Sequence, residues 1–187
     1  SSGYGRALEN IGLRDKGSSA ARRGEAMKEP KSRMSALISE GNLDHVQRVA
    51  KGEGMGHNSA ERAGATAALL ESKNFDPNDA KQVAGLTHFQ NNGGNLGEYS
   101  AKDPRLSRHD ISATRQTISK NPGMTEAQAQ QKNVDTNYSK LGVRGMRDLP
   151  ANAMDINFLR NAPANKNVKA ADEYSDAQIN QQKKFVT

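Results

Sequence analysis

The sequence predicts an all-α fold, a small helical bundle with a flexible basic leader before it and an extended arm after it. Apolar residues recur at spacings of three and four, and capping or Gly/Pro/Asn stop signals separate these segments. Hydrophobic residues make up only 34% of the 187 residues and aromatic residues 4%, and the mean hydropathy is −0.88. We therefore expect a compact helical domain at residues 32–141 between less compact flanks, the leader at 1–31 and an extended arm at 142–187 with a short terminal helix.

The first 31 residues are interpreted as a leader, because Gly17-Ser18-Ser19 and Glu29-Pro30 interrupt any helix there. Residues 1–33 hold eight Lys and Arg against four acidic residues, so they carry four of the six net positive charges. A basic tail is able to bind nucleic acid, but base stacking needs aromatic side chains, which are scarce here. A solvated arm is the favoured interpretation, and nucleic acid is not the expected partner.

The first two helices are expected to form a helical hairpin that begins at Ser32. Gly41 ends the first helix, and Asn42 caps the second. Their predicted apolar faces consist of Met34, Leu37, Ile38, Leu43, Val46 and Val49. Residues of this kind at helical spacing are typical of a core.

Two further helices are expected before residue 92. Ser59 opens an alanine-rich helix after a run of three glycines at 52–56, and alanine favours helix and close packing. Asp76 is predicted to cap the next helix, with Pro77 at its first position. The sequence Asn91-Asn92-Gly93-Gly94 is expected to stop it.

The stretch from Thr87 to Asn121 has the outline of a helix, a long loop and a second helix. Ser107, followed three positions later by Asp110, predicts a helix start, and this helix is expected from Arg108 to about Ser119. An Asn-Pro-Gly turn at 121–123 and a capping pair of Thr125 and Gln128 then predict the last helix. Its apolar positions are Ala127, Val134, Tyr138 and Leu141.

The loop from Tyr99 to Asp110 has the length of a calcium-binding hand. Such a loop needs oxygen ligands at positions 1, 3 and 5, glycine at 6 and a carboxylate at 12. Asp103 and Asp110 fit positions 5 and 12, but Tyr99, Ala101 and Pro104 stand where two ligands and the glycine belong. We therefore expect a degenerate EF-hand-like helix-loop-helix without a metal, and no cofactor elsewhere.

The segment KDPRLSRHDI at 102–111 resembles the EF-hand-like modules of HrpF/NolX-type type III secreted proteins of plant-associated bacteria. A phenylalanine near the preceding helix end, Phe89, and the turn at Asn121-Pro122 extend the resemblance over residues 69–141. The resemblance implies a bacterial protein that a secretion apparatus delivers.

Catalysis is not the favoured function, because no positioned acid, base or nucleophile stands out. The chain has no cysteine, and its four histidines are scattered singly. One enzymatic alternative is open: Glu71-Ser72 and Gly85-Leu86-Thr87-His88 are similar to elements of lytic transglycosylases. That resemblance implies Glu71 as the acid that protonates a glycosidic oxygen.

The expected function is that of a non-enzymatic bacterial secreted effector or helper that binds other proteins. The candidate interaction residues lie in the loop 91–107 and in the arm: Asn95, Tyr99, Asp103, Arg105, Leu149, Ile156 and Phe158. A structural or internal component of a phage virion or another large assembly is the alternative, since partners would order the polar flanks. No apolar run is long enough to span a membrane, and no signal-peptide core is found, so secretion by a non-Sec route or a place within a particle is expected.

Overall fold

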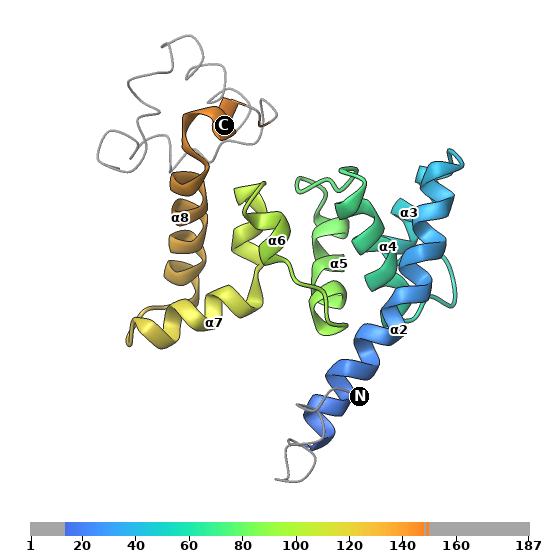
Figure 1. The fold of residues 1–187 in the computed structure, drawn as a ribbon, viewed down its shortest axis with the longest axis horizontal. Helices are drawn as coiled ribbons and strands as arrows, with labels where there is room; N and C mark the ends of the chain where they lie inside the picture. Colours follow the sequence, from blue (N-terminus) through green and yellow to red (C-terminus); the bar gives the residue numbers. More distant parts are fainter. Residues whose placement is uncertain (1–13, 148, 150–187) are drawn as a thin grey trace. The chain divides into compact units, whose positions relative to one another are not determined.

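A computed structural model of the chain describes residues 14–147 and Leu149, and it describes side chains for Arg22, 24–142, Gly145 and Leu149. Every regular element within these residues is helical, and the predicted all-α fold is confirmed (Figure 1). The first 13 residues of the expected leader lie outside the described residues. So does the arm from Pro150 on, with Ile156, Phe158 and the short terminal helix expected there.

The chain divides into two compact units, unit 1 up to Asn95 and unit 2 from Leu96. This division differs from the single domain expected at residues 32–141. The reason is that residues on either side of Asn95 pack mainly within their own unit. No helix in the described part of the chain is long and apolar enough to cross a membrane.

Unit 1 consists of four helices: α2 (Arg14–Ser39), α3 (Leu43–Ala50), α4 (Ser59–Glu71) and α5 (Ala80–Asn91). The alanine-rich α4 contacts each of the other three (Figure 1). The buried core consists of Met34, Val46, Val49, Ala50, Ala65, Ala68 and Leu69, with Leu37, Ile38, Leu43 and Phe75 packed against it. The predicted hairpin and its apolar faces are therefore confirmed.

The predicted helix start at Ser32 is wrong, because α2 begins at Arg14 and continues through Pro30. Proline inside a helix removes one backbone hydrogen bond and normally kinks or ends the helix. Here Pro30 is buried against α4, where Gly64 has no side chain to keep the backbones apart. A β-carbon on Gly64 would lie 2.6 Å from Pro30 Cβ and 2.6 Å from the Lys31 nitrogen. This close crossing compensates for the local cost of the proline.

Asn42 stands at the predicted N-cap of α3 but makes no side-chain cap hydrogen bond, and two other caps of unit 1 differ in position from the predicted ones. The start of α4 at Ser59 is confirmed, but Asn58 is the residue whose side chain accepts from the Glu61 amide, at 2.8 Å. The predicted cap at Asp76 is wrong, because Asp79 caps α5 and accepts from the Lys81 and Gln82 amides. Asp76 instead accepts from the Asn78 amide in a turn before the helix.

The predicted helix stops in unit 1 are confirmed. Gly41, Gly52 and Gly93 follow the ends of α2, α3 and α5 with φ of +86°, +73° and +88°. This left-handed conformation favours glycine, and it lets later amides bond back to the last carbonyls of the helix. The amide of Gly94, for example, donates to the Phe89 carbonyl at 2.8 Å.

Unit 2 consists of α6 (Gly97–Ser100), the 3₁₀ helix η1 (Pro104–His109), α7 (Ile111–Lys120) and α8 (Glu126–Arg147). Both η1 and α7 contact α8, and α6 contacts η1 (Figure 1). The buried apolar residues of this unit include Leu96, Leu106, Ala129, Val134 and Tyr138. The expected long loop is thus largely helical, and its apolar residues help to fill the core.

The predicted start of α7 at Arg108 is wrong, because a short 3₁₀ helix comes before α7. Residues 104–109 form η1, capped by Asp103, and α7 begins only at Ile111 with Asp110 as its cap. The predicted start of α8 is confirmed, because Thr125 and Gln128 each accept from the other's backbone amide. Val134 and Tyr138 are buried as expected, but Ala127 is exposed. Gly142 interrupts α8 with φ of +66°.

Candidate functional site

The predicted interaction residues of the loop have varied surroundings. Asp103 and Arg105 form a two-point ion pair, with Arg105 Nε 2.9 Å from one carboxylate oxygen and Nη2 2.8 Å from the other. Both side chains are largely buried, at 24% and 17% exposure, so they satisfy each other and stiffen the start of η1. Tyr99 is half-buried in α6 and Asn95 is exposed. Leu149, the one candidate interaction residue of the arm that the structure describes, is half-buried.

The two carboxylates of the calcium-hand segment cap different helices. Asp103 accepts from the Arg105 amide at 3.2 Å, and Asp110 accepts from the Ala113 amide at 3.0 Å. Within the described residues, no group of three or more His, Asp and Glu side chains lies close enough to hold a metal ion. The arrangement is that of two helix caps joined by a 3₁₀ turn.

Glu71, the alternative catalytic acid, lies at the end of α4 on the surface of unit 1. Its carboxylate forms an ion pair with Lys31 Nζ at 2.6 Å, and its side chain is 46% exposed. The general acid of a glycosidase is normally held in an apolar pocket that favours its protonated form. This geometry does not favour the enzymatic alternative.

A hydrogen-bonded cluster joins the first turn of α4 to the last turn of α5. Asn92 Nδ2 donates to Ser59 Oγ at 2.9 Å, and Ser59 Oγ lies 2.9 Å from His88 Nδ1. Ser59 Oγ and the ring of His88 thus share a hydrogen bond, whose direction depends on the tautomer of the neutral imidazole. Burial, with the nearby charge of Arg62, lowers the pKa of His88 and favours that neutral form. We interpret the cluster as a link between two helix ends.

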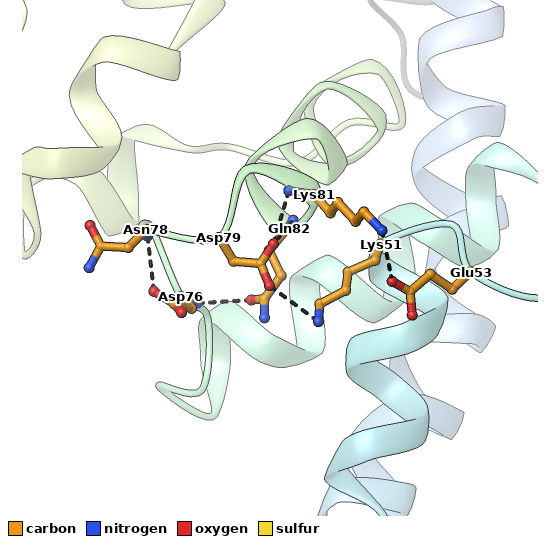
Figure 2. Close-up of polar contacts among 7 residues, drawn as sticks. All are labelled: Lys51, Glu53, Asp76, Asn78, Asp79, Lys81 and Gln82. Atoms are coloured by element: carbon orange, nitrogen blue, oxygen red, sulfur yellow. Dashed lines mark hydrogen bonds and ion pairs between the residues drawn. The ribbon is translucent and has the colours of Figure 1, made fainter.

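A second network in unit 1 joins the end of α3 to the start of α5 (Figure 2). Lys51 Nζ lies 3.2 Å from the Asp79 carboxylate, and Lys81 Nζ lies 3.3 Å from that of Glu53. Beside them, Gln82 Oε1 accepts from the Asp76 amide at 2.9 Å. These contacts fix the turn before α5, so the network has a structural role.

The pKa of Asp79 lies below its usual value. Burial of the carboxyl group by itself raises this pKa, but hydrogen bonds from Lys51 and from the Gln82 and Lys81 amides outweigh that effect. The charged form is therefore the stable form in the folded protein.

A polar groove of about 280 Å³ lies in unit 2 between α7 and α8. One wall comes from η1, the cap and α7: Ser107, Asp110, Ala113, Gln116, Thr117 and Lys120. The other wall comes from α8: Lys132, Asn133, Thr136, Asn137 and Lys140. Ala113 is the one residue with an apolar side chain among these eleven, so the groove is suited to a polar ligand.

Hydrogen bonds across the groove fix its walls. Asn133 accepts from Thr117 Oγ1 at 2.6 Å and donates to Thr114 Oγ1 at 3.3 Å. One turn later, Asn137 Nδ2 donates to Ser107 Oγ at 2.6 Å. Because these bonds join α8 to both α7 and η1, the groove is formed before any ligand binds.

The groove carries three lysines. Lys132 Nζ donates to Asn121 Oδ1 at a long 3.4 Å. Lys120 and Lys140 are exposed, and neither has a hydrogen bond or an ion pair within the described part of the chain. The carboxylate in the groove, Asp110, is buried and already engaged as the cap of α7. The walls therefore present positive charge that their own side chains do not neutralise.

These groove residues were missed by sequence reasoning, which singled out the loop and the arm. The signal on α8 is a polar stripe of Lys132, Thr136 and Lys140 at helical spacing, beside the apolar stripe that carries Val134 and Tyr138. The opposite wall carries no such signal, because it depends on how α7 packs against α8.

No protein-family model matches the chain, and neither a curated protein nor a solved structure is significantly similar to it. The functional argument therefore rests on the groove and its chemistry.

Proposed function

We propose that the protein is a non-enzymatic bacterial secreted effector or helper that acts by binding another protein. The observation that carries the proposal is the preformed polar groove between α7 and α8, with Lys120 and Lys140 free to pair with a ligand. Secretion and the type III class are supported by the resemblance over residues 69–141 alone. The groove is the proposed contact surface.

The rest of the described surface favours recognition through polar contacts. Among the described residues, Met55 is the one large hydrophobic side chain that is exposed, at 94%. A single exposed methionine does not form the contiguous apolar patch of a hydrophobic interface. Charge and hydrogen-bond complementarity then determine the choice of partner.

The loop predicted as an interaction surface has a supporting role in this proposal. The ion pair of Asp103 and Arg105 holds η1 in place, and η1 contributes Ser107 to the groove. Asn95 and Tyr99, with Leu149, Ile156 and Phe158 in the arm, are proposed as secondary contacts with the partner protein.

Site-specific photo-crosslinking tests the proposal. A photoreactive amino acid replaces Gln116 or Thr136 in the groove, or Ser32 on unit 1 as the control, and the variants are irradiated in extracts of the bacterium and of plant tissue. We expect discrete cross-linked species from the two groove positions that are absent from the control. The double variant Lys120→Glu/Lys140→Glu should remove them.

The same cross-linked pattern from Ser32, or no dependence on the two lysines, would contradict the proposal. The matched double variant Lys102→Glu/Arg115→Glu changes the charge of unit 2 equally. Both of its residues are exposed and lie outside the groove. It should therefore keep the cross-links.

A further inference from the structure

The three lysines of the groove have a spacing that a ligand must match. Lys132 and Lys140 lie eight residues apart on α8, which corresponds to about 12 Å along the helix axis. Lys120 faces them from the last turn of α7. The backbone spacing of the two lysines of α8 therefore suits a ligand with two negative groups about 12 Å apart.

Acceptor groups beside the lysines indicate a peptide ligand. Asn137 uses its amide nitrogen toward Ser107, which leaves its carbonyl oxygen without a partner among the described residues. Gln116 on α7 is exposed and has no hydrogen bond there either. Such oxygens are able to accept from backbone N–H groups, which a peptide has and a phosphodiester chain lacks.

The buried Asp110 carboxylate also lines the groove. It opposes a ligand with a continuous row of phosphates, because like charges repel at short range. A peptide with two separated carboxylates avoids this repulsion.

The spacing of the lysines fits an extended segment. In an extended chain, residues four apart are separated by about 13 Å and point to the same side, which matches the lysine spacing.

We infer that the groove binds an extended acidic segment of a partner protein, in which two carboxylates four residues apart pair with Lys132 and Lys140. Lys120 adds charge from the opposite wall, and Gln116 and Asn137 accept from the backbone of the segment. The inference rests on the proposed function and names the chemistry of its partner.

Fluorescence anisotropy with the full chain and labelled nine-residue peptides tests the inference. One peptide has Glu at positions 3 and 7 in a Ser/Asn background, and the control peptide has the same composition with the two Glu adjacent. We expect the spaced peptide to bind about fivefold more tightly, because each exposed ion pair contributes up to about 1 kcal/mol. Binding should weaken as salt is added.

Variants of the protein place this binding in the groove. Lys120→Glu/Lys140→Glu should weaken binding of the spaced peptide about tenfold, since the variant removes attraction and adds repulsion. Lys102→Glu/Arg115→Glu should change the affinity less than about twofold. Circular dichroism verifies that each variant is folded, and Lys120→Gln/Lys140→Gln replaces the charge reversal if that variant is not.

Three results would overturn the inference. These are equal affinity for the two peptides, no effect of the lysine variants on binding, and equally tight binding of an oligonucleotide of matched charge. Adding the spaced peptide to the photo-crosslinking experiment distinguishes a failure of this inference from a failure of the proposed function. If cross-links form at Gln116 and Thr136 but the spaced peptide does not reduce them, the inferred acidic ligand is wrong. The proposal that the groove binds a protein is then still supported. If those positions form no cross-links, the proposed function itself fails.

Discussion

Gly64 and Gly24 are both helical glycines of unit 1, but their surroundings are opposite. A β-carbon on Gly64 would meet the backbone of α2 at 2.6 Å, whereas one on Gly24 would meet nothing within 4 Å. The close crossing of α2 and α4 therefore depends on the missing side chain at Gly64 and not on that at Gly24.

Gly64→Ala should lower the free energy of unfolding of unit 1 by about 1–3 kcal/mol, the usual cost of overpacking. Gly24→Ala, the matched control, should raise it by up to about 1 kcal/mol, because alanine favours helix over glycine. Urea titration followed by circular dichroism measures both changes. A neutral or stabilising Gly64→Ala would mean that α2 and α4 do not approach as closely as described.

Asp79 gives unit 1 a predicted pH dependence. Its pKa is lowered in the folded state, because hydrogen bonds from Lys51 and two backbone amides outweigh the effect of burial. Its stabilising contribution is therefore present above the unfolded value of about 3.9 and is lost as the pH falls through the folded pKa.

The stability of the wild type should thus fall more steeply below about pH 4 than that of Asp79→Asn, which keeps a capping oxygen but has no charge. Urea midpoints measured between pH 7 and pH 2.5 provide the comparison. Parallel curves for the two proteins would show that the ion pair with Lys51 contributes nothing measurable.

At the scale of elements, the choice among neighbouring capping residues decides where each helix begins. Asp110, and not Ser107, caps α7, and Ser107 instead accepts from Asn137 across the groove. Asp110→Ala should speed amide exchange at Ala113, whose N–H bonds to that carboxylate, and should cost about 1 kcal/mol. Hydrogen exchange followed by NMR measures the exchange rate of the Ala113 amide. The control variant Ser112→Ala, at an exposed position of α7, should leave this rate unchanged.

Sequence patterns predicted the order and type of the helices well, because apolar spacing and glycine stops are local signals. Local signals also caused the errors. Both Asp76 and Asp79 fit a helix cap, but Asp79 is the residue that caps α5, and it also pairs with Lys51. Pro30 indicated a break in α2 that its packing against Gly64 overrides. Tertiary contacts of this kind have no signature in a single segment.

At the scale of the whole molecule, the division at Asn95 predicts that the two units unfold separately. Leu69→Ala removes a fully buried side chain of unit 1 and should cost about 2–5 kcal/mol. Amide protection should then fall in α2–α5 and stay unchanged in α7 and α8. Native-state hydrogen exchange measures both, and an equal loss in both units would contradict the division.

The candidate site, like the helix starts, depends on tertiary contacts that the sequence does not reveal. The lysine stripe of α8 is visible in the sequence, but the groove requires α7 to lie beside it, held by Thr117 and Asn133. The loop residues Asp103 and Arg105 were predicted as contacts because they lie in the loop 91–107, yet they pair with each other. Burial and pairing, which the sequence does not specify, separate free charges from engaged ones.

The most direct test of the account is a ¹⁵N NMR titration of the full chain with the spaced acidic peptide. The account predicts that chemical-shift changes concentrate at the groove residues Gln116, Lys120, Lys132, Thr136 and Lys140, and that Lys120→Glu/Lys140→Glu removes them. Unit 1 amides should not shift. Changes located outside the groove, or changes that persist in this variant, would contradict the claim that the α7–α8 groove is the partner-binding surface.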